Sequence, residues 1–348
     1  MKRIYYVSKF SRRLSKQEID KIHEASARNN SSNKITGFLV CLGDSFFQVL
    51  EGPAVALDRL YYEKILSDDR HKDVLCINVE KGVRKRLFPS WHMRVFNLND
   101  EGEVLPFAFR QMLTALLESY LTTARYTQPS VFSMLQSGLD PGSIAPRRKS
   151  ATVLFSDIIG FSRFAEHISA RELIDLVNSH IEVCTHWVSR FGGEVNKLTG
   201  DGVLAYFSGR KSDAAIEASL GIIEEMGQRR SRSAPDSPHR CLYGGVGLAA
   251  GLVYEGNIGV KLKQDFTILG NKVNLASRLE GLTRELNVRL AVDASVTRRA
   301  EVDWPFQSLG RKDLKGQSKP VEVFTLDSLP RLDLDEVYSK IDHHIRRC

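Results

Sequence analysis

Apolar runs and amphipathic segments alternate in the same order in two parts of the chain. The first part comprises a β-rich run at 3–10, a helix opening at Ser15, two strands around a Gly-Asp turn within 35–52, a helix at 54–70 and a strand at 74–80. Ser15 and Glu18 have the spacing of a capping box, which marks the start of that first helix. The order predicts a β-α-β-β-α-β unit of the ferredoxin-like type.

The same order begins again near residue 150. Its elements are a strand at 152–156, a helix from Ser169 to Gly192-Gly193, a hairpin at 194–207, a helix at 213–228 and a strand at 243–254. Ser169 and Glu172 form a second capping box, and glycines suit the C-terminal end of a helix. The predicted fold class is α+β, with two ferredoxin-like domains joined by a helical linker.

The segment between the two units reads as helical from about residue 105 and then as a connector, broken within 127–146 by Pro129, Pro141 and Pro146. The alternatives are a flexible tether and a packed helix. Packing against a partner is favoured by apolar residues at helical spacing: Phe109, Leu113, Leu116 and Leu117. We expect four regions: residues 1–100, a linker and dimerisation segment at 101–149, residues 150–327, and a charged helical tail at 328–348.

Composition narrows the setting in which the protein works. No apolar run approaches the roughly 20 residues of a membrane-spanning helix, so no membrane is expected. The five cysteines show neither metal-binding nor disulfide spacing, which indicates a reducing cytoplasm. The net charge of +7 favours acidic partners such as nucleotides. The basic clusters at 145–150 and 227–233 lack interleaved aromatic residues and indicate solvated surface, with no nucleic-acid partner.

An acid, Asp157, directly follows the buried-strand pattern of residues 152–156, and a second acid, Asp201, lies at the tip of the predicted hairpin. A buried carboxylate is costly unless it is paired or binds a cation. If the hairpin flanks the first strand, the two carboxylates converge, and paired acids at strand ends suit magnesium. The alternative is that Asp157 caps a helix and Asp201 fills a turn.

Several motifs in fixed order give the second half a specific resemblance. The segments FSDIIGFS, GGEVNKLTGDGVLAYF, GNIG, DFTILGNKVNLASRLE and DLKGQSKPVEVF resemble class III nucleotidyl cyclases in their order, over roughly residues 150 to 325. The resemblance implies that Asp157 and Asp201 bind two Mg²⁺ ions, with Mn²⁺ as a substitute, and that the Ile158 carbonyl helps to bind one ion. Asn274 and Arg278 would position the ribose and stabilise charge on the phosphoryl group.

The same resemblance implies which residues recognise the nucleotide. Lys197 and Thr267 match the base-selecting pair, Asp265 would support Lys197, and Lys315 would contact the triphosphate. A lysine donates to adenine N1, and a threonine hydroxyl accepts from the exocyclic amine. Guanine presents the opposite pattern, and a glutamate at position 197 would be expected for GTP. The expected substrate is therefore ATP.

The resemblance also implies the reaction and the assembly. The ribose 3′-hydroxyl would attack the α-phosphorus, expel pyrophosphate and close cyclic AMP. In homodimers of the family each site is shared: one chain supplies Asp157 and Asp201, and its partner supplies Lys197, Thr267, Asn274 and Arg278. This chain departs from many relatives at Asn271, where they have aspartate, and at Thr267, where many adenylyl cyclases have aspartate. Neither change indicates an inactive enzyme.

The first half has a constellation of its own. On composition alone, a tyrosine and a glutamine in strands satisfy each other or water. The run from YYVSKFS through ITGFLVCLGDSFFQVLEG to FPSWHM nevertheless resembles BLUF domains, the blue-light sensors that hold FAD, over residues 1 to about 97. The implied cofactor-binding residues are Tyr6, Arg28, Asn29, Asn30, Gln48, Arg70, His71, Trp91 and Met93.

The resemblance implies roles for several of these residues. The flavin ring would lie between the two helices, with Asn30 bound to its polar edge. Gln48 would bridge Tyr6 and the flavin, and its amide, which has a donor end and an acceptor end, would reorient after light drives an electron and a proton from Tyr6. Trp91 and Met93 would carry the change outward.

The sequence thus predicts an enzyme, a blue-light-activated adenylate cyclase that acts as a soluble homodimer on ATP. A light-regulated guanylate cyclase and a non-catalytic, flavin-based light-responsive binding module are the alternatives. The intact set of Asp157, Asp201, Lys197, Asn274 and Arg278 argues against the binding module.

Overall fold

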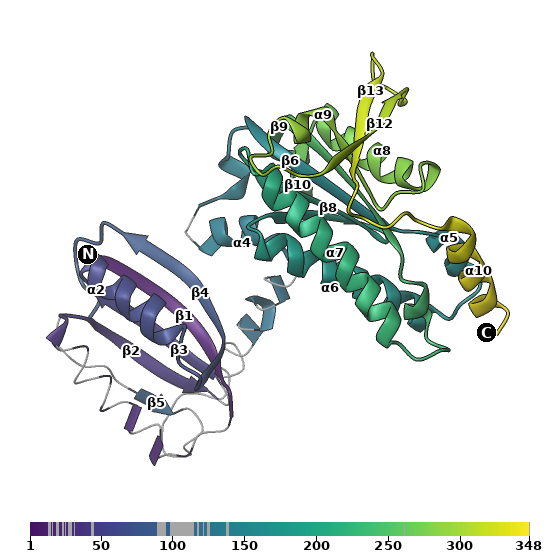
Figure 1. The fold of residues 1–348 in the computed structure, drawn as a ribbon. Helices are drawn as coiled ribbons and strands as arrows, with labels where there is room; N and C mark the ends of the chain where they lie inside the picture. The colour runs from purple at the N-terminus through teal and green to yellow at the C-terminus, as the bar shows by residue number, and fades with distance from the viewer. Residues whose placement is uncertain are drawn as a thin grey trace. The chain divides into compact units, whose positions relative to one another are not determined.

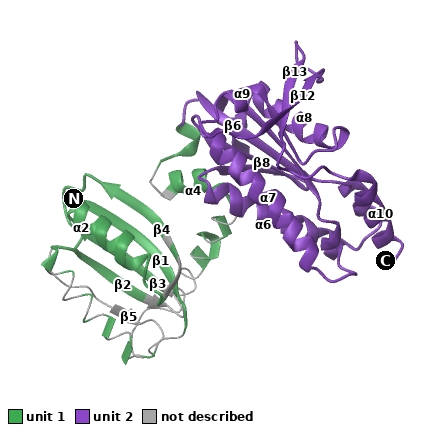
Figure 2. Cartoon of the chain, in the orientation of Figure 1, with its two compact units in different colours: residues 1–143 green, residues 144–348 purple. Residues whose placement is uncertain are grey.

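A division after Ser143 separates the computed structural model into two units, residues 1–143 and 144–348 (Figure 2). The structure describes residues 1–12, 15, 17–18, 21–22, 24, 26, 30, 32–42, 45–88, 95–97, 115–116, 118–120, 122–123, 126–136, 139–260 and 262–347. Each unit is built on a sheet of its own (Figure 1).

The first unit has a sheet of order β4-β1-β3-β2-β5. Its strands are β1 Lys2–Phe10, β2 Thr36–Leu42, β3 Ser45–Gly52, β4 His71–Lys81 and β5 Val95–Asn97. The first four pair antiparallel in the ferredoxin-like order, as predicted, and β5 adds a parallel strand beside β2. The register sets Tyr6 directly opposite Gln48.

A helical segment packs against this sheet and buries the apolar side of β1. It begins as α2 (Ala54–Asp58) and continues as the π-helical η1 (Arg59–Ile65). Leu57, Tyr61 and Ile65 pack with Ile4 and Tyr6, because residues at alternate positions of a strand share one face. The predicted capping box is present: Ser15 N–H donates to Glu18 Oε2 at 2.9 Å, and Glu18 N–H to Ser15 Oγ at 3.4 Å.

The predicted break at residues 127–146 is wrong over α4 (Pro129–Gln136), which is helical. Proline is tolerated in the first helical turn because its missing N–H has no intrahelical partner there. Phe132 is buried and its ring lies 5.3 Å from that of Tyr120, whose hydroxyl donates to the carbonyl of Cys76 on β4. This part of the linker is therefore packed against its own unit, which removes the flexible-tether alternative for it. A short 3₁₀ turn, η2 (Pro141–Ser143), follows.

The second unit has a sheet of order β12-β13-β11-β9-β6-β8-β7, with β10 paired to β9. The strands are β6 Arg147–Ile158, β7 Glu194–Thr199, β8 Gly202–Ser208, β9 Gly244–Val260, β10 Lys263–Leu269, β11 Leu290–Asp293, β12 Phe306–Lys312 and β13 Val321–Leu326. The central order β9-β6-β8-β7 is again ferredoxin-like, as predicted, and the fold class is confirmed.

Helices cover both faces of this sheet (Figure 1). They are α5 Phe161–Ala165, α6 Ala170–Arg190, α7 Ser212–Arg232, η3 Pro238–Cys241, α8 Asn271–Glu285, α9 Ala294–Thr297 and α10 Leu334–Ile345. Leu154 of β6 faces α6 and α7, whereas its neighbour Val153 faces α8, which explains why the central strands read as continuous apolar runs. The α8 backbone lies so close to Gly247 of β9 that an added Cβ would come within 2.2 Å of a helix carbonyl oxygen.

The C-terminal segment is helical, as predicted, and it packs against the unit. On α10, Val337, Ile341 and His344 are buried. Ile341 Cδ1 lies only 2.5 Å from where a Cβ on Gly160 would stand, and Arg163 pairs with Asp342 at 3.2 Å. The helix therefore closes the core beside the loop that follows Asp157.

Candidate active site and cofactor pocket

Two acids converge where β6 ends and the β7–β8 hairpin turns. The backbone N–H of Ile158 donates to Asp157 Oδ1 at 3.1 Å and to Asp201 Oδ2 at 3.2 Å. The pairing of β8 with β6 brings the hairpin tip to that strand end, and Gly200 supplies the positive φ of 71° in the turn. The structure thus brings the predicted acids together around one backbone group.

This arrangement sets two negative charges side by side. Asp201 is 9% exposed, and burial together with the neighbouring Asp157 carboxylate raises the pKa of Asp201 to about 8. A divalent cation between the carboxylates would relieve that repulsion, and carboxylate oxygens are the ligands that magnesium prefers. Over the part of the chain that the structure describes, no group of three or more His, Cys, Asp or Glu side chains could hold a metal by itself. The donor set fits a metal that also takes oxygens from a substrate.

A buried histidine that sequence reasoning missed ties these two strand ends together. His180 of α6 is fully buried, with Nδ1 2.9 Å from the Asp201 carbonyl oxygen and Nε2 3.0 Å from Ser156 Oγ. Burial lowers the pKa of His180 to about 4, so the neutral ring donates from Nδ1 and accepts at Nε2. The available signal was a polar residue on the apolar side of a helix, in line with Leu176 and Cys184.

Replacing His180 with leucine is expected to lower the free energy of unfolding by about 2–4 kcal/mol, because it leaves the Ser156 hydroxyl and the Asp201 carbonyl without their partner. Urea unfolding of the purified protein measures the change. His186→Leu is the matched control: it lies on the same helix, is exposed, and should change stability by less than about 0.5 kcal/mol. Equal losses for the two variants would contradict the bracing role.

A second group lies where β7 meets β10. Lys197 Nζ pairs with Asp265 Oδ2 at 2.6 Å, so the two residues that were expected to interact are in direct contact. Both side chains remain partly exposed, at 33% and 44%. Thr267 lies beside them, is 2% exposed, and donates its hydroxyl hydrogen to Asn196 Oδ1 at 2.8 Å. Asn196 was not among the predicted residues.

The remaining predicted residues lie on α8 and the loop before β13. Asn274 is exposed, and Arg278 is half-buried. A cavity of about 550 Å³ is lined by Arg278, Gly281, Leu282, Arg284, Glu285, Lys312, Asp313, Leu314 and Lys315. Arg278 and Lys315 therefore share one cavity, in which basic side chains outnumber acidic ones.

A buried acid, Glu280, lies one helical turn before Arg284 on α8 and was also missed. Arg284 Nη1 lies 3.0 Å from Glu280 Oε1. Burial raises the pKa of Glu280 to about 7, the neighbouring Asp157 carboxylate acts in the same direction, and Arg284 opposes both. The charge of Asp157 thus acts on the helix that carries Arg278.

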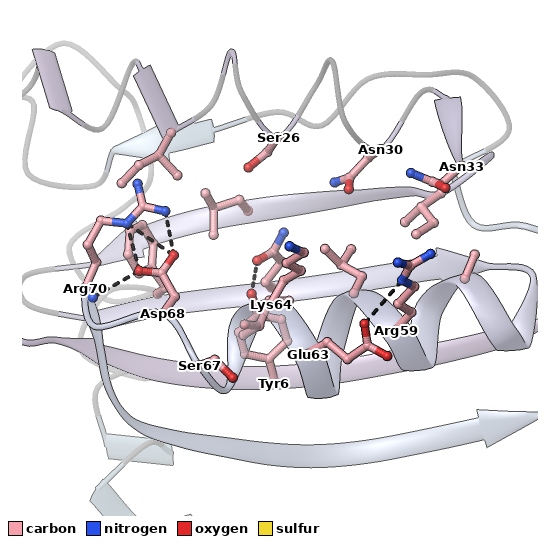
Figure 3. Close-up of a pocket in the computed structure, with 18 of the residues that line it drawn as sticks. Tyr6, Ser26, Asn30, Asn33, Arg59, Glu63, Lys64, Ser67, Asp68 and Arg70 are labelled. Carbon is pink, nitrogen blue, oxygen red and sulfur yellow. Dashed lines mark hydrogen bonds and ion pairs between the residues drawn. The ribbon is translucent and has the colours of Figure 1, made fainter.

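The first unit has a cavity of about 860 Å³, partly open to solvent, between its helical segments and the sheet (Figure 3). Ser26, Asn30 and Asn33 line one side, and Arg59, Glu63 and Lys64 of η1 line the other (Figure 3). Apolar walls come from Ile22, Ile35, Leu39, Phe46, Leu60 and Ile65. This volume is in the range of small-molecule sites, and apolar walls combined with many polar and charged lining groups suit a flat aromatic ring that carries polar substituents.

Tyr6 and Gln48 form the polar floor of this cavity. The Tyr6 hydroxyl donates to Gln48 Oε1, and burial raises the pKa of Tyr6 well above its ordinary value. Asn30 lines the same cavity and is 4% exposed. The predicted trio of Tyr6, Asn30 and Gln48 therefore lines one cavity.

Other predicted residues of this site are placed less directly. Arg70 lines the cavity, where its Nε lies 2.8 Å from Asp68 Oδ1 (Figure 3). Arg28, Asn29, Trp91 and Met93 lie outside the described residues, as does the side chain of His71. Sequence reasoning missed the charged lining residues Arg59, Lys64 and Asp68, whose signal was only their position on or just after the predicted helix at 54–70.

Each of the two units matches a known protein family. Residues 1–94 match the BLUF family, described as sensors of blue-light using FAD. Residues 144–328 match the family described as adenylate and guanylate cyclase catalytic domain. Within the described ranges, no helix has the length and apolar character needed to cross a membrane.

Some relatives match along nearly the whole chain. The photoactivated adenylate cyclase subunit beta of Euglena longa is 29% identical over 99% of this chain, and subunit alpha of Euglena gracilis is 30% identical over 93%. The chain spans only 40% and 31% of the length of these relatives. A solved structure of a bacterial light-regulated adenylyl cyclase is 38% identical, with a TM-score of 0.92 over 99% of this chain and 100% of that one.

Proposed function

Because the chain belongs to the family of adenylate and guanylate cyclase catalytic domains and carries a BLUF domain before it, we propose that it is a blue-light-activated adenylate cyclase. The ribose 3′-hydroxyl of ATP attacks the α-phosphorus, pyrophosphate leaves, and cyclic AMP closes. The observation that carries the proposal is the convergence of Asp157 and Asp201 on one backbone N–H, in a chain whose first unit encloses the Tyr6–Gln48 pair.

The metal site is assigned to Asp157, Asp201 and the Ile158 carbonyl. When bound, two Mg²⁺ ions, or Mn²⁺ in their place, supply activation of the 3′-hydroxyl and stabilisation of charge on the leaving pyrophosphate. The chain's own part is to hold both carboxylates at one point. The β6–β8 pairing and the His180 contacts do this before substrate arrives, which is the preorganisation that electrostatic catalysis requires.

The phosphates are assigned to the cavity beside α8. Arg278 stabilises charge on the reacting phosphoryl group, because its guanidinium is planar and permanently charged. Lys315, in the same cavity, binds the triphosphate as a point charge. Asn274 lies four residues before Arg278, so both fall on one side of the helix, where Asn274 positions the ribose.

The base is assigned to the group on β7 and β10. Lys197 donates to adenine N1, and Asp265, which lies 2.6 Å from its Nζ, orients the ammonium group. Thr267 accepts from the exocyclic amine. Guanine carries a donor at N1 and an acceptor at O6, so the same pair disfavours GTP.

The catalytic unit acts as a homodimer in the cytoplasm, with each site shared between two chains. One protomer supplies Asp157 and Asp201, and its partner supplies Lys197, Thr267, Asn274 and Arg278. The exposure of Asn274 and the partial exposure of Lys197 leave them accessible to a substrate held between protomers.

Sharing predicts complementation between two inactive variants. Asp201→Asn and Arg278→Ala should each be inactive alone, whereas co-refolded chains should regain about a quarter of wild-type activity, because half of the random dimers have one site free of both changes. Cyclic AMP formation by the co-refolded mixture measures this. If mixing restores nothing, the two residues act in one chain and the assignment is wrong.

The cofactor of the first unit is assigned as FAD. Asn30 binds the polar edge of the ring, and Arg59, Lys64 and Arg70 at the cavity lining offer positive charge to its phosphates. When bound, the flavin supplies blue-light absorption and an acceptor for an electron from a nearby phenol. Tyr6 Oη would pass its proton toward the Gln48 side chain that it contacts and regain it when the electron returns, which leaves Gln48 with its amide reversed, so that a donor faces where an acceptor was.

One assay tests the proposed function directly. The purified protein, loaded with FAD, is given magnesium and ATP in the dark and under blue light, with GTP in parallel. Cyclic AMP formation that rises in the light is expected, with little cyclic GMP. No cyclic nucleotide in either condition would leave a binding module, and a preference for GTP would refute the roles of Lys197 and Thr267.

A further inference from the structure

The β7 strand contains an irregularity at the point where it meets the base-recognition residues. Val195 pairs with Ala205 and Lys197 with Leu204, so β7 has one residue more than β8 at this point, Asn196. In a regular strand, consecutive side chains point to opposite faces. A bulge lets two consecutive side chains point to the same side, and bulges are common beside active sites for this reason.

The bulge allows both Asn196 and Lys197 to reach the neighbouring β10. Asp265 and Thr267 are two residues apart, so they share one face of β10. Lys197 Nζ meets Asp265 Oδ2 at 2.6 Å, and Asn196 Oδ1 meets Thr267 Oγ1 at 2.8 Å. A regular β7 would present only one of its two residues to this pair.

From this geometry we propose that Asn196 is a specificity-determining positioning residue, which fixes the Thr267 hydroxyl as a hydrogen-bond acceptor. A threonine hydroxyl has one hydrogen to donate and lone pairs that accept. Its hydrogen is committed to Asn196 Oδ1, and the alternative acceptor, the Ile268 carbonyl, is 3.5 Å away. Thr267 and Asn196 are 2% and 4% exposed, so water does not exchange with that bond.

This inference rests on the proposed function and accounts for one departure from the family pattern. Thr267 occupies the position where many adenylyl cyclases have an aspartate, whose side chain only accepts. With its hydrogen taken by Asn196, Thr267 presents lone pairs alone and behaves toward a base as that aspartate would. An adenine amine is a matching donor, whereas guanine O6 would set acceptor against acceptor.

The test compares ATP with GTP in three variants of the full-length, FAD-loaded protein. Asn196→Leu removes the acceptor at similar volume, Asn196→Asp keeps an acceptor, and Thr267→Val removes the hydroxyl. The ratio of kcat/KM for ATP to that for GTP is expected to fall about tenfold in Asn196→Leu, since the freed hydroxyl can donate to guanine O6. Asn196→Asp should keep the preference for ATP.

Coupling between the two positions separates positioning from general damage. Thr267→Val should also lower the ratio, and adding Asn196→Leu to it should change nothing further, because the asparagine acts only through the hydroxyl. An unchanged ratio in Asn196→Leu, additive effects in the double variant, or loss of the preference in Asn196→Asp would each overturn the inference. Thermal unfolding checks that each variant is folded. If Asn196→Leu does not fold, the test depends on Asn196→Asp.

Nucleotide binding keeps this test separate from the proposed function. Displacement of a fluorescent ATP analogue by ATP and by GTP gives a ratio of affinities without turnover. If the wild-type protein forms no cyclic nucleotide, the proposed catalysis fails, but the affinity ratio still decides the role of Asn196. An affinity ratio that favours ATP in the wild type and falls in Asn196→Leu supports the inference; equal ratios refute it.

Discussion

Asp201→Asn is expected to reduce light-stimulated cyclic AMP formation by about a thousandfold or more, equivalent to roughly 4 kcal/mol of transition-state stabilisation. Asparagine has nearly the same shape but lacks the charge that the bound cations need. The side-chain oxygen of the asparagine can still accept the hydrogen bond from the backbone N–H of Ile158, so the hairpin should stay in place. Initial rates with magnesium and ATP under saturating blue light measure the loss.

The fold should not suffer from this change, which separates catalysis from stability. Burial and the Asp157 carboxylate raise the pKa of Asp201 to about 8, so in the metal-free protein near pH 7 the side chain must take up a proton on folding, a cost that the neutral asparagine does not have. The free energy of unfolding without metal is therefore expected to stay level or rise. The exposed Asp236→Asn is the control, with activity unchanged. Activity within tenfold of wild type in Asp201→Asn would refute the metal assignment.

The order of secondary structure was predictable in both units because its signals are local. Capping boxes, apolar periodicity and a glycine-rich hairpin tip depend on residues close in sequence, and the two ferredoxin-like orders follow from them. The convergence of Asp157 and Asp201 followed as well, since a hairpin that flanks the first strand must bring its tip to that strand's end.

The contacts that support these residues depend on tertiary structure and could not be predicted from the sequence. A period-2 interpretation of β7 puts Asn196 and Lys197 on opposite faces, and only the pairing with β8 reveals the bulge. His180 looks like one more residue of an amphipathic helix until Ser156 and Asp201 are seen on either side of its ring. The prediction of a break at Pro129 was wrong for a related reason. Proline disrupts the interior of a helix but is tolerated in its first turn, and the sequence alone does not tell the two positions apart.

Tyr6→Phe is expected to abolish light activation and leave dark activity unchanged. The change removes the hydroxyl that donates to Gln48, and with it the proton that must move when the amide reverses. A hundredfold activation by population shift requires about 2.7 kcal/mol of bias, and two rearranged hydrogen bonds supply about 3 kcal/mol only if each reaches the upper value of about 1.5 kcal/mol. Losing the first of them therefore leaves too little bias for a hundredfold activation. The light-minus-dark absorption spectrum of the bound flavin should lose its red shift.

Tyr5→Phe provides the matched control, because the neighbouring residue of β1 faces the other side of the sheet. Its hydroxyl donates to Glu80 Oε1 at 2.8 Å, and it lines no part of the cavity that holds Tyr6. The two variants lose the same atom from adjacent positions, so a general effect of deleting a buried hydroxyl would appear in both. The red shift and the light activation should survive in Tyr5→Phe and disappear in Tyr6→Phe. A red shift that persists in Tyr6→Phe would show that the photochemical donor is another residue, and that the Tyr6–Gln48 bond only stabilises the sheet.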